Sequence, residues 1–274
     1  MIKLGISTCP NDTFAFHGLL TGKVSVPGLE LSIELLDIQQ LNNGLQSGRL
    51  DVAKGSFYSA CRLSGSHVVL PVGAAIGFGV GPIIVSSRGH DFQWETARAM
   101  CPGSGTTASF LFQHFHPEVP YLVQGVFSGI PSAVASKHVD VGVLIHEGRF
   151  TFEDQGLQLV EDLGDMWEKS YQLPLPLGGL FAKQTLSATV LDQVTSAVQE
   201  SLHYALAHRD EVVDTMARYA QEFSPEVLWK HVELYVNSET FVLSEKGRAA
   251  VSYMFDVANE GGLLGIAAPP LNVL

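Results

Sequence analysis

The chain has 274 residues, of which 46% are hydrophobic and 16% charged, and its formal net charge is −12. This length fits one large or two medium domains with well-filled cores. Nucleic acid and anionic membranes are bound chiefly through Lys and Arg, so the excess of Asp and Glu argues against both as partners. Local basic groups can still bind a small anion.

The amino-terminal segment MIKLGISTCP carries one Lys and then a short strand-like run. It lacks the long apolar region and small-residue cleavage site of a secretory signal, so we expect a cytoplasmic protein unless a leader has been trimmed. No apolar stretch approaches the ~20 residues that span a bilayer. Cys9, Cys61 and Cys101 are an odd number at wide spacing. We expect them to be small buried or half-buried side chains, without a disulfide framework or a metal site.

Strand and helix patterns alternate from the start of the chain. KLGIS (3–7) predicts a strand, and NDTFAFHGLLTG (11–22) predicts a helix capped by Asn11 or Asp12 and stopped by Gly22.

The next two segments continue this alternation. LELSIELL (29–36) has the period-two pattern of a half-buried strand. IQQLNNGLQSG (38–48) places its apolar residues on one helical face, with Asp37 as a possible cap. Strand–helix–strand order of this kind implies a parallel or mixed sheet covered by helices.

Two segments resemble each other. LQSGRLDVAKGS (45–56) and VASKHVDVGVLI (134–145) both run from a helix end through a basic residue into a strand with an apolar-Asp-Val start. Many helix-to-strand turns have this appearance. The alternative is that the chain holds two similar α/β lobes with a site between them.

Two other segments have the composition of crossings between lobes. Residues 73–89 contain five glycines, four of them before an apolar strand, and residues 173–183 (LPLPLGGLFAK) combine rigid prolines with pliant glycines. The ~90 residues between them make a plausible inserted lobe. The predicted division is therefore 1–85 with 185–274 in one lobe and 86–184 in the other. The mostly helical segment after Leu186 should pack on the first lobe, with its apolar residues in the core.

Several polar stretches follow predicted strands. PGSGTTASF (102–110) is a glycine-containing loop that leads into a helix, where backbone N–H groups attract a carboxylate or phosphate. Thr106 and Thr107 can cap this helix or donate to a ligand. The Lys of a phosphate-binding P-loop is missing. The loop is therefore either a plain capping turn or an anion site.

KGSFYSA (54–60) leaves the strand that begins at Asp51. Lys54 is therefore expected at the carboxyl end of that strand, where open α/β sheets bind their ligands. It is either a solvated Lys or a ligand-binding group. Residues 7–14 (STCPNDTF) lie at the same predicted edge.

His146 follows the apolar run VDVGVLI, and Glu147 stands next to it. A lone His is often structural, but the imidazole titrates near neutral pH and suits a general base. The place at a strand's carboxyl end favours this second reading. Adjacent residues on a strand point to opposite faces, so Glu147 need not orient His146. No pair of His residues has metal-binding spacing, and no serine nucleophile or dinucleotide motif is present.

Four of these stretches together resemble one family. STCPNDTFAFHGL, PGSGTTASF, LIHEGRFTF and LPLPLGG resemble the 1,4-dihydroxy-6-naphthoate synthases of the futalosine route to menaquinone. The similarity runs through SLHYALAH and HVELYVN, over nearly the whole chain. Two departures are Thr8, where the family commonly has Pro, and Ser104-Gly105, where bulkier residues are usual. The second departure could reshape an anion pocket.

The resemblance implies an α/β fold of the type II periplasmic-binding-protein kind, with two lobes, mixed sheets and a ligand cleft between the lobes. It also implies a lyase that splits cyclic dehypoxanthinylfutalosine, a small carboxylate, into dihydroxynaphthoate and a sugar-derived fragment. The family's proposed base corresponds to His146. Its substrate contacts correspond to the stretch Lys54, Gly55 and Ser56 and to Thr107 with Ala108.

No redox cofactor is expected, because proton removal leads to elimination, carbon–carbon cleavage and an aromatic ring. Three alternatives remain. A solute-binding protein for a small carboxylate would be exported and would need no positioned His. Chorismate dehydratase, of the same pathway, matches the Cys-Pro-Asn-Asp start and the His-Glu-Gly strand end less well. A ligand-sensing regulatory domain would normally be joined to a DNA-binding segment.

Overall fold

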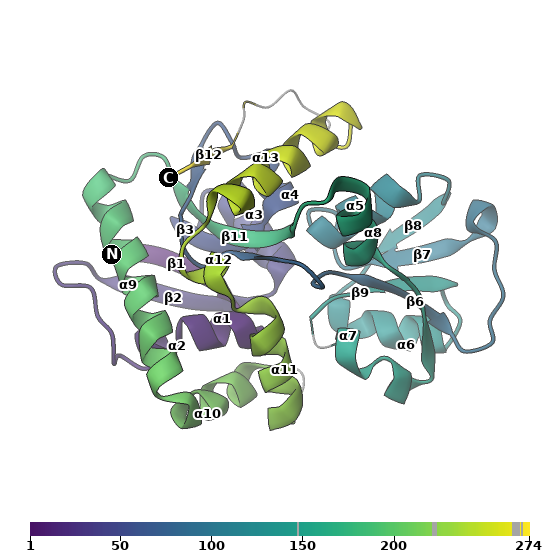
Figure 1. Ribbon diagram of the computed structural model, residues 1–274, viewed down its shortest axis with the longest axis horizontal. Helices are drawn as coiled ribbons and strands as arrows, with labels where there is room; N and C mark the ends of the chain where they lie inside the picture. Colours follow the sequence, from purple (N-terminus) through teal and green to yellow (C-terminus); the bar gives the residue numbers. More distant parts are fainter. Residues whose placement is uncertain (147, 221–223, 265–268, 270) are drawn as a thin grey trace. The chain divides into compact units, whose positions relative to one another are not determined.

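The chain folds into two compact α/β units, each built on its own mixed sheet (Figure 1). Met1–Gly77 and Pro176–Leu274 form the first unit, and Phe78–Leu175 forms the second. Both junctions lie within the glycine-rich and proline-rich segments singled out above. The computed structural model describes residues 1–146, 148–220, 224–264, 269 and 271–274.

The sheet of the first unit has the strand order β12-β4-β11-β3-β1-β2, with β5 paired to β11. Strand β1 is parallel to β2 and β3, whereas β11 is antiparallel to β3. The carboxyl ends of β1 and β3 therefore lie at one edge. The strands are β1 (Ile2–Ser7), β2 (Leu31–Leu36), β3 (Val52–Ser56), β4 (His67–Val69), β5 (Ala75–Gly77), β11 (Leu175–Lys183) and β12 (Asn272–Val273).

The helices of the first unit come from both parts of the chain. The amino-terminal part supplies α1 (Pro10–Ala15), α2 (His17–Leu20), α3 (Ile38–Gln46) and α4 (Phe57–Cys61). The helical segment after Leu186 supplies α9 (Ala188–Ala207), α10 (Arg209–Tyr219), α11 (Pro225–Tyr235), α12 (Ser238–Phe241) and α13 (Glu245–Glu260).

The predicted helix caps had different outcomes. Asp37 caps α3 as predicted: its carboxylate accepts from the backbone N–H of Gln40, and the Gln40 side chain accepts from the Asp37 N–H. The prediction that Asn11 or Asp12 caps the first helix is wrong. Cys9 is the cap residue, because the helix already begins at Pro10. The expected single helix is also interrupted, at Phe16, where α1 ends and α2 follows.

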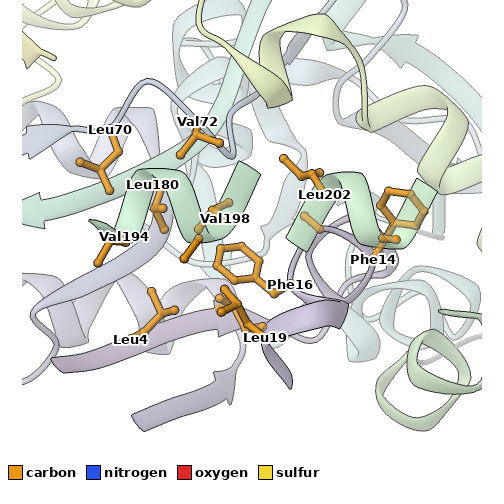
Figure 2. Packing of buried hydrophobic residues seen from close by; sticks show 14 of the residues in the cluster. Leu4, Phe14, Phe16, Leu19, Leu70, Val72, Leu180, Val194, Val198 and Leu202 are labelled. Carbon is orange, nitrogen blue, oxygen red and sulfur yellow. The ribbon is translucent and has the colours of Figure 1, made fainter. Parts of the chain in front are cut away.

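The core of the first unit joins the sheet to the carboxyl-terminal helices (Figure 2). Leu4 of β1 and Leu180 of β11 belong to the same buried cluster as Val198 and Leu202 of α9. The three- and four-residue spacing of apolar residues in α9 thus predicted core positions correctly, and Met216 is likewise fully buried.

The sheet of the second unit has the strand order β10-β6-β9-β7-β8. Strand β7 is parallel to β8 and β9, so the carboxyl ends of these three strands share one edge. The strands are β6 (Ile83–Ser87), β7 (Arg98–Cys101), β8 (Tyr121–Gln124), β9 (Val141–Leu144) and β10 (Leu157–Asp162). The helices are α5 (Thr107–Phe115), α6 (Ile130–Ala135), α7 (Gly148–Thr151) and α8 (Leu163–Tyr171), with 3₁₀ turns η1 (Trp94–Thr96), η2 (Phe127–Gly129) and η3 (Glu153–Gln155).

The two similar sequence segments adopt the same local structure. Asp51 precedes β3 and Asp140 precedes β9. Each backbone N–H donates to the carbonyl of the residue just before the first paired position on the neighbouring strand, Lys3 or Arg98 (2.9 Å in both). In return, the backbone N–H of Lys3 or Arg98 donates to the carboxylate of that aspartate, at 3.0 and 2.8 Å. Each unit therefore starts an inner strand with the same aspartate clamp.

Both aspartate clamps perturb the pKa of the carboxyl group in the same direction. Burial alone would raise the pKa of Asp51, but hydrogen bonds from Lys183 and the Lys3 N–H outweigh burial and lower it. Burial likewise opposes the shift at Asp140, where hydrogen bonds from the Arg98 N–H and from His90 lower the pKa below its ordinary 3.8. Both carboxylates thus favour the folded chain in their charged form.

Candidate active site

A buried ion pair joins β3 to helix α1 in the first unit. Lys54 Nζ lies 3.1 Å from Asp12 Oδ1, and only 7% and 4% of these side chains is exposed. Lys54 also donates to the carbonyl of Gly73 (2.6 Å). The other Asp12 oxygen accepts from the backbone N–H of Ser7 at the end of β1 (3.1 Å). Lys54 is therefore an internal, paired cation and not the solvated Lys considered above.

Asn11 extends this polar network to a helix of the carboxyl-terminal segment. Its amide nitrogen donates to Asp12 Oδ1 (3.1 Å), and its oxygen lies 2.9 Å from His231 Nε2. Since an amide oxygen only accepts, His231 carries its proton on Nε2. His231, on α11, is 1% exposed. The start of α1 is thus held by charged and polar groups from three segments of the chain.

Ser56, and not Lys54 as predicted, is the last residue of β3; Lys54 and Gly55 precede it within the strand. Asn42 of α3 accepts from the Ser56 backbone N–H (2.9 Å) and donates to the Ser56 hydroxyl oxygen (3.3 Å). A Cβ at Gly55 would lie 2.9 Å from a Leu45 methyl group, so the absent side chain lets α3 pack closely on β3. Because Ser56 Oγ accepts from Asn42, its own hydrogen can be directed to another acceptor.

In the second unit, the loop after β7 forms a capped helix start. Thr106 caps α5 through the backbone N–H of Ser109 (3.1 Å). The side-chain hydroxyls of Thr106 and Ser109 also donate to the Gly103 carbonyl, at 2.8 Å and 2.7 Å. The capping turn predicted for this loop is therefore present. Thr107 and Ala108 are buried in the first turn, at the positive end of the helix dipole.

His146 lies two residues beyond the carboxyl end of β9, the central strand of the second sheet. Its φ of 56° places it in the left-handed region, which costs a residue with a side chain roughly 1–3 kcal/mol. Its ring meets that of Phe127 edge to face, with 5.1 Å between centroids. The predicted place at the carboxyl end of an inner strand is confirmed. Glu147 lies outside the described residues.

The turn that carries His146 is anchored on its carboxyl side by Arg149. The Arg149 backbone N–H donates to the His146 carbonyl (3.3 Å). Its guanidinium donates to the Gly81 carbonyl (2.8 Å) and forms an ion pair with Asp162 (2.5 Å). Asp162 in turn caps α8. A planar guanidinium with several donors can fix this turn in one orientation.

Two other histidines of this unit are held by neighbouring side chains. His116 is 6% exposed and lies between Glu118 (3.1 Å) and Glu161 (2.8 Å), with its ring stacked 4.0 Å from that of Trp94. No local sequence pattern predicts this arrangement, because Glu161 is distant from His116 along the chain. His138 is exposed and bonded to Ser136 (2.7 Å).

The three cysteines are buried, as predicted. Burial raises the pKa of the Cys61 and Cys101 thiols to about 12, so neither is a reactive nucleophile. Within the described residues, no three His, Cys, Asp or Glu side chains gather into a group that could hold a metal ion. None of the helices in that part of the chain has the length and apolar character needed to cross a membrane.

Sequence reasoning missed Asn42, His231 and Phe127 as partners of the candidate residues. Asn42 had a detectable signal, because it lies beside Leu41 and Leu45 on the apolar side of a predicted helix, where a polar residue is unexpected. His231 and Phe127 had none, since each meets its partner only through the tertiary fold.

Comparison with solved structures defines the fold class. A protein of Archaeoglobus fulgidus superimposes with a TM-score of 0.91 at 30% sequence identity, over 96% of this chain and 98% of that chain. A Candida albicans protein described as having the generic periplasmic binding protein fold matches with a TM-score of 0.67 at 12% identity, over 99% and 97% of the two chains. The two α/β units with mixed sheets thus have the periplasmic-binding-protein fold, as the sequence predicted.

Sequence comparison identifies the family. The menaquinone biosynthesis family matches residues 2–260. A 1,4-dihydroxy-6-naphthoate synthase of Thermus thermophilus is 40% identical over 273 residues, which cover 99% of both chains. One of Streptomyces coelicolor is 34% identical, over 98% of this chain and 96% of its own. The chain belongs to the menaquinone biosynthesis family.

Proposed function

We propose that this enzyme of menaquinone biosynthesis is a 1,4-dihydroxy-6-naphthoate synthase with His146 as its general base. This proposal rests mainly on the 40% identity, over 99% of the chain, with the Thermus thermophilus synthase. The substrate is cyclic dehypoxanthinylfutalosine, and the products are 1,4-dihydroxy-6-naphthoate and a sugar-derived fragment. In this reading the enzyme is a carbon–carbon lyase of the futalosine pathway. That it acts in the cytoplasm stays a prediction.

In the proposed reaction His146 takes a proton from the substrate. The electrons of the broken C–H bond drive elimination and cleavage of the carbon–carbon bond that holds the sugar remnant. The ring that remains gains aromaticity, so the reaction transfers no electrons to a redox cofactor. The left-handed backbone at His146 supports this role, since strained residues held by their surroundings cluster at functional sites.

The substrate carboxylate and hydroxyls need hydrogen-bond donors. In the second unit, Thr107 and Ala108 stand in the first turn of α5, where the helix dipole favours negative charge. In the first unit, the Asn42 contact turns the Ser56 hydroxyl towards donation. We assign substrate binding to these groups. Lys54 and Gly55 belong to the same strand as Ser56, and the ion pair with Asp12 lets the Lys54 ammonium hold β3 against α1.

A direct assay tests the function. Purified protein is incubated with cyclic dehypoxanthinylfutalosine, and dihydroxynaphthoate is followed by absorbance and mass. Formation of the naphthoate is the expected result. Chorismate in a parallel reaction tests the dehydratase alternative, and binding of the futalosine derivative without turnover would point to a solute-binding protein. Either of these two outcomes would overturn the proposal.

A further inference from the structure

We propose that Phe127 is a positioning residue for His146, a role that rests on the proposed function of His146 as the base. The two rings meet at 76° with 5.1 Å between their centroids, which is the favoured edge-to-face arrangement. A phenyl ring forms no strong hydrogen bonds. It can therefore restrict the imidazole without competing for the ring nitrogen that must receive the proton.

The fold brings these two residues together from opposite ends of one crossover. The chain leaves β8, forms η2 from Phe127 and then α6, and returns through β9 to His146. Both β8 and β9 are parallel to β7, so α6 must run back across the sheet, and it packs on β9 (Figure 1). The start of the helical segment thus lies beside the carboxyl end of the strand.

Close packing fixes the separation between this helix and strand. Gly142 is in the middle of β9, and a Cβ there would lie 2.5 Å from a methyl group of Ile130 and 2.6 Å from one of Val134. Only glycine permits this approach. Both α6 residues are fully buried. This rigid core contact lies three residues after Phe127 and four residues before His146 along the chain, so it sets the position of one relative to the other.

The surroundings of Phe127 indicate that its ring serves the contact with His146 and is not part of the hydrophobic core. Its neighbours Val126, Ser128 and Gly129 are exposed, and Phe127 itself is only half-buried. On the other side of the turn, Arg149 holds the chain that follows His146 through its ion pair with Asp162. Phe127 restrains the ring and Arg149 restrains the backbone, and together they can hold His146 in its left-handed conformation.

The test compares Phe127→Leu with Phe127→Tyr and with Phe92→Leu. Phe92 is a matched control: its ring also meets an aromatic partner edge to face, Trp94 at 4.9 Å, but it precedes the amino end of β7. We expect Phe127→Leu to lower kcat by about tenfold or more with little change in KM, because misplacing a catalytic group by ~1 Å can cost up to ~10²-fold. Phe127→Tyr keeps the ring and should restore kcat, and Phe92→Leu should leave it unchanged.

A second readout is independent of activity. In a protein with ¹³C-labelled histidines, the His146 ring signal is assigned by its loss in His146→Asn. It should shift in Phe127→Leu and stay in place in Phe92→Leu. An unshifted signal, or equal losses of kcat in the two Leu variants, overturns the positioning role. If His146→Asn is inactive but Phe127→Leu has normal kcat, only the positioning role of Phe127 is refuted. If His146→Asn is active, the proposed base is refuted, and the positioning role falls with it.

Discussion

Replacing Asp12 by Asn removes the negative charge that faces Lys54 in the first unit. The ammonium would keep the Gly73 carbonyl at 2.6 Å as a partner but would lose the carboxylate at 3.1 Å. Because only 7% of the Lys54 side chain is exposed, water cannot replace the lost partner. The Asn side chain can still accept from the Ser7 N–H. The missing charge is therefore the dominant effect.

The expected loss of stability in Asp12→Asn follows from the burial of the Lys54–Asp12 pair. Breaking a buried pair by removing one partner destabilises a protein by roughly 3–5 kcal/mol, because the remaining charge is left uncompensated. For a domain of this size that corresponds to a fall in Tm of about 6–20 °C. The exposed pair of Glu226 and Lys230 offers a control, with 76% and 55% of the two side chains exposed. We expect Glu226→Gln to change stability by no more than ~0.5 kcal/mol.

A double-mutant cycle with Lys54→Met isolates the pair from the rest of the network. The double variant lacks both charges, so we expect a coupling energy of about 1–3 kcal/mol. Urea unfolding gives the free energies. Hydrogen exchange followed by mass spectrometry should show reduced protection in peptides of the first unit only. A coupling energy below ~0.5 kcal/mol would refute the reasoning, as would a loss in Asp12→Asn no larger than that in Glu226→Gln.

Three further predictions concern single residues. His146→Asn should fold and still bind substrate while turnover falls by roughly 10²–10⁴-fold. The parent enzyme's activity should rise with pH, and this rise should be absent in His146→Asn. The exposed-site control His138→Asn should stay active, and near-normal turnover in His146→Asn would refute His146 as the base. Thr107→Val should weaken binding of dihydroxynaphthoate by about 1–2 kcal/mol in calorimetry, the scale of one hydrogen bond, and unchanged affinity would remove Thr107 from the site. The folded-state pKa of Asp140 is depressed, so its contribution is present above pH 3.8 and lost as the pH falls through the lower folded value; Asp140→Asn should flatten the acid limb of urea stability, and an unaltered limb would contradict this.

Local sequence patterns predicted the features that depend on neighbours along the chain. The Asp37 cap of α3 and the buried stripe of α9 follow from short-range spacing, and both are confirmed. The cap of the first helix failed for a tertiary reason. Asp12 would suit a helix start by its type, but its carboxylate is taken by Ser7 N–H and by Lys54.

The alternation of strands and helices was enough to place His146 beyond the end of an inner strand. Ser56 and Thr107 were expected as substrate contacts only from the family resemblance, and the contacts that each residue makes were not predicted. The partners of these residues come from distant segments: Asn42 approaches Ser56 from α3, and Phe127 reaches His146 through the α6 crossover. Such pairs depend on sheet order and helix packing, which no local pattern encodes.

Each unit has an energetically unfavourable feature in a segment that carries candidate site residues. The buried Lys54 and Asp12 charges each carry a desolvation cost of several kcal/mol, and well-packed apolar residues could often replace such a pair without loss of stability. His146 adds backbone strain beyond the end of β9. The rest of each sheet follows the ordinary rules, with buried apolar strands and aspartate clamps where Asp51 and Asp140 begin the inner strands. Conflicts with folding rules are expected where function requires particular groups. Lys137 and Gln172 share this left-handed backbone but follow helices α6 and α8, so the place of His146 beyond an inner strand, and not its φ alone, supports its proposed role.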